Sequence, residues 1–270
     1  MTRDMATFLI GAPLENLYLV MALSMLRMVG FCYGFIAFTW GLGTNLTLRV
    51  GIAFTMSIPI MIGFIPEASQ LAEEASALEL TFIASKELLL GYAVGIVASG
   101  PFRAMQYAGS IIDTFRGESD SGLVTPDGAQ IQTISNFYLT IGIFVFVSIG
   151  GLWELFEIVY KTFSIWPLEL GFPDFYEGAA EIVVDTLTHA LKLALFIAAP
   201  LMTLLVGTEF VLMLAAKIGR RFSLYSFSFL LKNLIVIFTL PIVAQLMIYI
   251  AEKYTQEAIF SLPTIESFFK

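Results

Sequence analysis

Few residues in this chain could carry out enzyme chemistry. The 270 residues include one histidine, His189, and one cysteine, Cys32, whereas a zinc site needs three or four Cys, His or carboxylate ligands. Asp185 and His189 would share one face of a helix, and we interpret them as an interfacial pair near a helix end. Neither a Gly-x-Ser-x-Gly motif nor a glycine-rich phosphate loop occurs. The sequence therefore predicts a protein that is not an enzyme and uses no metal or other cofactor.

Charged residues inside long apolar stretches are the second chemical feature. Arg27, Glu209 and Lys232 stand in such stretches, where a buried charge is costly and indicates a functional site or an interface. Glu209 and Lys232 flank the same short turn, each separated from it by about 11 to 14 Å of helix, so they can come level and pair. An ion pair within the hairpin, pore lining and a subunit contact all remain open as their role.

The elements that hold these residues must be apolar. Hydrophobic residues make up 58% of the chain and charged residues 13%, with a mean hydropathy of +0.85, whereas typical soluble domains contain about 25% charged residues. The formal net charge is −8, which gives no basic surface for a nucleic-acid backbone. This composition excludes a soluble globular enzyme, a disordered chain and a nucleic-acid binder, and it indicates a membrane protein.

The gaps between charged residues predict six apolar helical segments. They cover residues 28–48, 50–66, 88–102, 128–153, 193–208 and 233–251. A spanning helix needs about 20 residues, so 88–102 and 193–208 suffice only if Lys86 and Lys192 snorkel or if these helices pack inside protein. Between the second and third segments, 67–80 is either an amphipathic helix or an acidic loop. We expect an all-α fold of membrane-type helical hairpins.

Glycine spacing predicts close packing of these helices. Gly91 and Gly95 form a Gly-x-x-x-Gly motif, and Gly30 and Gly34 repeat it; such stripes let helix backbones approach. We expect one domain, 1–270, with an N-terminal helical part, 1–175, and a C-terminal helical hairpin, 176–270.

Basic residues do not decide the orientation, because both sides of the predicted topology carry the same number. The tightest basic cluster lies in the turn before the last apolar segment, and we expect this side to be cytoplasmic. The cluster consists of Lys217, Arg220 and Arg221.

The order of residues in the middle of the chain resembles a known family. Lys86-Glu87 precede the glycine stripe, and Pro101-Phe102, Gly109, Asp113 and Arg116-Gly117 follow it. This order resembles the SctT/FliR family of type III secretion export-gate proteins over most of the chain. Pro126 and Gly128 also resemble the family's Asp-Pro loop, with Thr125 in place of the Asp.

The C-terminal part resembles the same family. Glu209 and Lys232 stand where the family has an acidic residue and a lysine on either side of a basic turn, and Pro200 also fits. Departures from the family pattern occur in and near this turn, and they suggest a divergent branch from an injectisome of virulence or symbiosis more than from a flagellum. The departing residues are Ala216-Lys217, Arg220-Arg221 and Leu230.

The resemblance implies a gate subunit in the bacterial inner membrane, at the base of the secretion apparatus and lifted toward the periplasmic side. The expected function is to help form the pore by which unfolded export substrates enter. The implied partners are SctR/FliP-like and SctS/FliQ-like gate subunits, SctU/FlhB-like and SctV/FlhA-like export proteins, the inner rod, unfolded protein substrates and membrane lipid. The C-terminal hairpin resembles the small SctS/FliQ-like subunit.

The resemblance also implies that the loop 109–128 projects into the pore as a plug. Its glycines permit a mobile backbone and its charges keep it solvated, although the residue types alone fit a plain hydrophilic loop. The expected plug residues are Gly109, Asp113, Arg116, Gly117, Glu118, Asp120, Gly122, Pro126, Asp127 and Gly128. Arg27, Lys86, Glu87, Glu209 and Lys232 are the expected intramembrane charges that serve assembly.

A different class of protein remains as the alternative function. A small-molecule or ion-coupled permease would use Arg27, Glu209 and Lys232 at its binding site. Permeases often contain paired broken helices from an internal repeat. We find no convincing repeat, although Pro59, Pro200 and Pro241 could break three of the spans.

Overall fold

The computed structural model describes residues 14–43, 45–74, 76–117, 132–167, 179–218 and 224–257. These residues are almost entirely helical, with several long apolar helices, so the predicted fold class is confirmed. Three of the described helices are long and apolar enough to cross a membrane, namely Ala77–Ala98, Leu187–Lys217 and Phe227–Leu246. Thr133–Ser148 together with Gly151–Ile165 would add a fourth if they form one broken span.

The helices belong to two compact units, and each unit combines segments that are distant in the sequence. Unit 1 contains α2 (Leu14–Gly34), α3 (Ile36–Leu42), α4 (Leu46–Glu74), α5 (Ala77–Ala98) and, from Trp153 on, α8 (Gly151–Ile165). Unit 2 contains α6 (Gly100–Arg116), α7 (Thr133–Ser148), α9 (Ala179–Ile218, from Glu181 on) and α10 (Leu224–Glu257). This division differs from the predicted one at residue 175, because α6 and α7 pack with α10.

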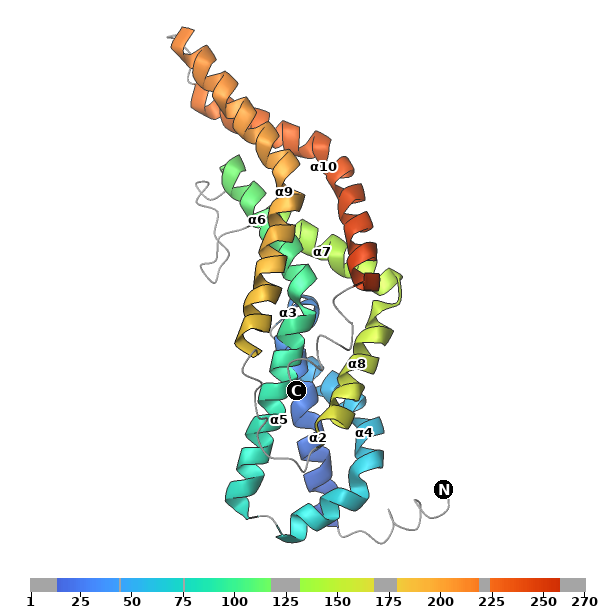
Figure 1. Cartoon of the computed structure of the whole chain (residues 1–270). Coiled ribbons are helices and arrows are strands. Elements are labelled where there is room, and N and C mark those ends of the chain that lie inside the picture. Colours follow the sequence, from blue (N-terminus) through green and yellow to red (C-terminus); the bar gives the residue numbers. More distant parts are fainter. Residues whose placement is uncertain are drawn as a thin grey trace. The chain divides into compact units, whose positions relative to one another are not determined.

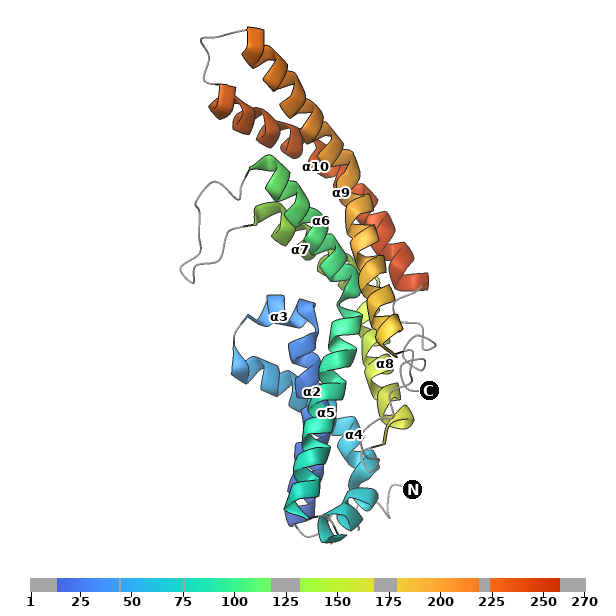
Figure 2. The same ribbon diagram turned by 60° about the vertical axis from the view of Figure 1, so that its left-hand side comes forward.

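In unit 1, α2 packs along both α4 and α5. The two views agree that α2 and α5 lie side by side (Figures 1 and 2). The start of α5 is fixed by a capping box: the Glu79 N–H donates to Ser76 Oγ at 3.3 Å, and the Ser76 N–H donates to Glu79 Oε2 at 2.7 Å. Because α4 continues to Glu74, most of the range 67–80 is helical.

The first predicted apolar segment, 28–48, is not one continuous helix. It breaks at Phe35, whose backbone is extended (φ −81°, ψ 113°). The α3 helix ends at Leu42 and is followed by Gly43, whose φ of +58° is one that glycine adopts most easily. The Arg49 guanidinium donates to the carbonyl oxygens of Thr39 and Gly43. It therefore satisfies carbonyls at the C-terminal end of α3, where the helix has no partners of its own.

In unit 2, α6 and α7 form an antiparallel hairpin, and α9 and α10, which meet at Glu209 and Lys232, form a longer one (Figure 2). Both long helices continue through their prolines, Pro200 and Pro241, and α4 likewise continues through Pro59. These prolines do not end the helices. The core shared by the two hairpins includes Ala104, Met105, Ala108, Ile112, Tyr138, Ile197, Leu201, Leu205 and Val236.

Candidate functional site

Arg27 and Glu87 form a buried ion pair between α2 and α5. Arg27 Nε donates to Glu87 Oε2 at 2.6 Å and Nη2 donates to Oε1 at 2.9 Å, which is the bidentate geometry of a strong charge-assisted pair. The side chains are only 1% and 0% exposed. The sequence predicted both as intramembrane charges, and the structure shows that they pair with each other.

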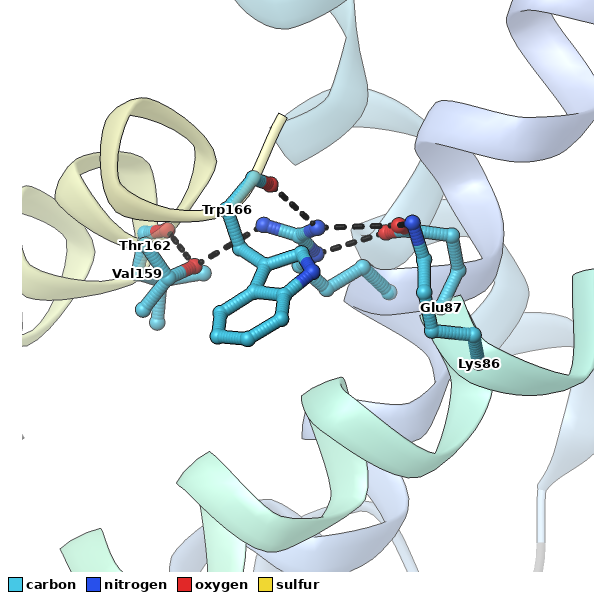
Figure 3. A network of polar contacts seen from close by, with 6 residues as sticks. Lys86, Glu87, Val159, Thr162 and Trp166 are labelled. Carbon is cyan, nitrogen blue, oxygen red and sulfur yellow. Dashed lines mark hydrogen bonds and ion pairs between the residues drawn. The ribbon is translucent and has the colours of Figure 1, made fainter. Parts of the chain in front are cut away.

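The same guanidinium also reaches the last turn of α8. Nη1 donates to Thr162 Oγ1 at 3.3 Å, Nη2 donates to the Trp166 carbonyl at 2.9 Å, and the Phe163 ring lies 3.9 Å from the guanidinium carbon. Figure 3 shows Thr162 and Trp166 on one side of this cluster and Glu87 with Lys86 on the other. Four of the five N–H groups of Arg27 are engaged, so the side chain joins three helices of unit 1.

A second cation shares the carboxylate. Lys86 Nζ lies 3.2 Å from Glu87 Oε1, and the Lys86 side chain is also buried. One anion thus stands between two cations. Glu87 therefore contacts two buried cations.

The glycine stripes bring the backbones of α2 and α5 close enough for these contacts. A Cβ on Gly91 would overlap the Arg27 carbonyl oxygen, and a Cβ on Gly95 would lie 2.8 Å from both Phe31 O and Phe35 N. A Cβ on Gly30 would lie 2.9 Å from Tyr92 N. Real Cβ atoms are not found at such distances, so the two helices can run in parallel contact only with glycine at these positions.

Ser99 satisfies the backbone at the break between α2 and α3. Its Oγ accepts the Ile36 N–H at 2.8 Å and lies 3.0 Å from Gly34 O and 2.7 Å from Gly95 O. Ser99 is fully buried. Non-helical backbone in an apolar environment needs such partners, and this hydroxyl supplies them.

After the Arg27–Glu87 pair and Ser99 in unit 1, Asp113 forms a third buried polar centre, which lies in unit 2. Its two carboxylate oxygens accept the backbone N–H groups of Ile134 at 3.2 Å and Ser135 at 3.0 Å, and Arg116 Nη2 lies 3.1 Å from Oδ1. Burial raises the pKa of the Asp113 carboxyl above its ordinary value, while the two N–H groups and Arg116 oppose that rise. An acid of α6 thereby accepts the N–H groups of the second and third residues of α7, which have no partners within the helix.

Glu209 and Lys232 meet between α9 and α10. Lys232 Nζ donates to Glu209 Oε2 at 3.2 Å and to the Phe115 carbonyl of α6 at 3.0 Å. The Lys232 side chain is 9% exposed and the Glu209 side chain 48%. The lysine is therefore the buried member, and it connects both arms of the hairpin to the end of α6.

Other predicted site residues lie in different settings. Gly109, Asp113 and Arg116 belong to α6, so the range 109–128 is not a loop from its start; the helix runs to Arg116 and Gly117 turns out of it with φ +90°. Lys217 is exposed in the last turn of α9. His189 Nε2 lies 3.5 Å from Asp185 Oδ2, with both side chains exposed. Glu118, Asp120, Gly122, Pro126, Asp127, Gly128, Arg220 and Arg221 lie outside the described residues.

Several contributors were not singled out from the sequence. Thr162 contributes a hydroxyl and Ser135 a backbone N–H to the polar centres. Uncharged residues of this kind are common in apolar helices, so their types alone carried no signal. Within the described part of the chain, no three His, Cys, Asp or Glu side chains gather as metal ligands would.

These features define a helical membrane protein whose buried charges join one helix to another. The chain matches the family described as "Bacterial export proteins, family 1" over residues 18–258. It belongs to this family, the SctT/FliR family of type III export proteins.

Relatives with curated descriptions come from both secretion and flagellar systems. The chain is 28% identical to "Yop proteins translocation protein T" of Yersinia pestis over 208 residues, which are 76% of this chain and 78% of that protein. It is 27% identical to "Surface presentation of antigens protein SpaR" of Shigella flexneri over 58% of this chain and 60% of that one. It is 27% identical to "Flagellar biosynthetic protein FliR" of Bacillus subtilis over 63% and 64% of the two chains. The protein is thus a membrane component of a type III export apparatus.

Proposed function

We propose that this chain helps to form the export gate of a type III secretion system, the pore by which unfolded substrates enter the apparatus. The observation that carries the proposal is the similarity to translocation protein T over three quarters of both chains. The buried charges agree with it. Arg27, Glu87 and Lys232 are used in contacts between helices of this chain, as expected of a protein that works by shape and assembly.

We further propose that the residues between α6 and α7 act as the plug of this pore. Support comes from their glycines and charges and from the family resemblance. Because α6 includes Gly109, Asp113 and Arg116, we restrict the moving part to the residues from Gly117 on.

Deletion of residues 117–127 tests the plug. We expect assembled gates with the deletion to conduct ions across the inner membrane, measured as loss of membrane potential in cells. A Gly/Ser replacement of equal length separates the effect of shortening the chain from that of removing its side chains. Unchanged conductance in assembled gates would refute the plug role.

The partners proposed for the gate are SctR/FliP-like and SctS/FliQ-like subunits, in the inner membrane and lifted toward the periplasmic side. Co-expression of the tagged chain with its neighbouring genes, followed by purification in mild detergent and native mass determination, tests this. We expect one large complex that contains small helical-hairpin proteins. A stable monomer or homodimer without partners would contradict the gate.

One observation favours the permease as a second candidate. The α2 helix breaks at Phe35 inside an apolar segment, and broken helices form binding sites in many transporters. The backbone groups at this break, however, are hydrogen-bonded to Ser99: the Ile36 N–H donates to its Oγ, which in turn lies within hydrogen-bond distance of the Gly34 carbonyl. If the chain purifies alone, reconstitution in vesicles with assays of solute uptake becomes the deciding experiment.

A further inference from the structure

The N-terminus of α7 is capped from another helix. Gln132 holds the N-cap position, with φ −111° and ψ 89°, and its side chain makes no capping hydrogen bond. Asp113 of α6 instead accepts the N–H groups of Ile134 and Ser135. An N-cap side chain ordinarily accepts a hydrogen bond from one of these two N–H groups, whereas Asp113 accepts from both.

Two more contacts continue along the same face of α6. Ser135 Oγ donates to the Gln106 carbonyl at 2.9 Å, and Gly109 meets the Ser135 backbone so closely that a Cβ there would lie 2.6 Å from Ser135 N. Gln106, Gly109 and Asp113 are spaced three and four residues apart, as one helix face requires. Ser135 therefore contacts three successive positions on one face of α6, at Gln106, Gly109 and Asp113.

We propose that Asp113 is a positioning residue that clamps the start of α7 to the end of α6 and so keeps both ends of the segment 118–131 together. The clamp consists of Gln106, Gly109, Asp113, Arg116, Ile134 and Ser135. Its members are buried or half-buried, and opening it would leave two backbone N–H groups without partners and the Asp113 carboxylate with Arg116 of its own helix alone. The clamp would thereby fix where the proposed plug joins α6 and α7; this consequence rests on the proposed plug function.

The test must separate the clamp from simple helix capping. Asp113→Ala removes both. Adding Gln132→Ser gives α7 a local cap for one of these N–H groups but does not restore the link from Asp113 to α6. Asp113→Ala with Gln132→Ser should therefore regain part of the thermal stability that Asp113→Ala loses, without regaining that link.

The clamp itself is measured as a distance. Spin labels at Thr114 and Asn136, both exposed, in a Cys32→Ala background of the full chain should give one narrow distance distribution. We expect Asp113→Ala with Gln132→Ser to broaden this distribution at least twofold and to make assembled gates leak ions. Thr140→Ala is the matched control, because the Thr140 hydroxyl bonds only to its own helix at Asn136 O.

The outcomes distinguish the two proposals. A narrow, unshifted distance in the doubly substituted chain would show that Asp113 only caps α7, and would overturn the clamp. If the distance broadens but these gates stay as tight as the parent, while deletion of 117–127 does cause a leak, the clamp does not position the plug. If that deletion causes no leak, the plug proposal fails, and the distance measurement alone decides the clamp.

Discussion

At the scale of single residues, the balance of charge around Glu87 has an energetic consequence. Arg27 and Lys86 are both buried and both contact this one carboxylate. Removing one partner of a buried pair is strongly destabilising because an uncompensated charge remains, at a cost of about 3–5 kcal/mol. The three residues are therefore not equivalent.

We predict that Glu87→Ala destabilises the protein more than Arg27→Ala. Loss of Glu87 takes the carboxylate from both Arg27 and Lys86, whereas loss of Arg27 leaves Glu87 with Lys86 at 3.2 Å. We expect a loss of about 3–5 kcal/mol for Glu87→Ala, measured by denaturant unfolding in detergent. Lys161→Ala, which removes an exposed pair with Glu157, should cost under about 1 kcal/mol. Equal effects of the two buried substitutions would contradict this ranking.

The Glu209 and Lys232 pair predicts a different asymmetry. Lys232 is the buried member and also donates to Phe115 O, so Lys232→Ala should impair assembly of the gate more than Glu209→Ala. Exchange of the two charges should restore only part of the assembly, because a carboxylate at 232 would face the Phe115 carbonyl. The yield of complex after affinity purification measures this. Full recovery on exchange would show that the contact to Phe115 contributes nothing.

How far the sequence predicts such sites depends on the distance between partners along the chain. Glu209 and Lys232 could be matched because they flank one turn. Arg27 and Glu87 were both singled out as intramembrane charges, but they are 60 positions apart, and their pairing depends on how α2 and α5 align. Asp113 was expected in a loop, although its side chain caps a helix that begins 20 residues later. No local pattern contains that information.

At the scale of elements, glycine sets the separation of α2 and α5. We predict that Gly91→Ala disrupts unit 1, because its Cβ would meet the backbone of Arg27, which cannot move aside as a flexible side chain would. Overpacking of this kind costs about 1–3 kcal/mol. Gly207→Ala is the matched control: this helical glycine has open space around it, so the change should be neutral or stabilise by up to about 1 kcal/mol. The melting temperatures of both variants test this. An unchanged melting temperature for Gly91→Ala would contradict the close contact between α2 and α5.

The break between α2 and α3 gives a second prediction for elements. Ser99→Ala should leave the Ile36 N–H buried without a partner, at a cost of about 1–3 kcal/mol. Ser85→Ala on the same α5 helix is the control, since that exposed hydroxyl bonds only to Phe82 O. Hydrogen exchange at Ile36 should quicken in Ser99→Ala alone. Unchanged protection would show that another group holds the break.

The sequence predicted the helical segments better than their ends. All six apolar segments contain helix, but 28–48 breaks at Phe35, where no proline stands. The break depends on a hydroxyl 63 positions away. Pro200 and Pro241, which would have suggested breaks, lie inside continuous helices. Proline positions therefore predicted breaks that do not occur and missed the one that does. The break at Phe35 could not be predicted locally, because the partner of its backbone comes from another helix.

At the scale of the whole molecule, each unit consists of segments that are separated in the sequence, because the chain enters each unit more than once. The sequence instead predicted one domain, 1–270, with two parts that meet at residue 175. The α8 helix belongs to unit 1 because Arg27 binds its last turn, and α6 joins α10 through Phe115 and Lys232. The polar centres thus tie together helices that are distant in the sequence.

The last prediction concerns what covers the outer faces of α9 and α10. Phe196 and Phe210 on α9, and Phe238 on α10, are at least 60% exposed in the single chain, while Leu201 and Leu205 of α9 are buried. If these helices pack against gate subunits, a lipid-soluble photoactivated probe should label the exposed phenylalanines in the isolated chain and lose most of that labelling in the assembled complex. Mass spectrometry of peptides resolves each position, with the two leucines as unlabelled controls in both states. If the helices instead cross the bilayer as conventional spans, labelling stays the same after assembly, and the helices face lipid and not protein.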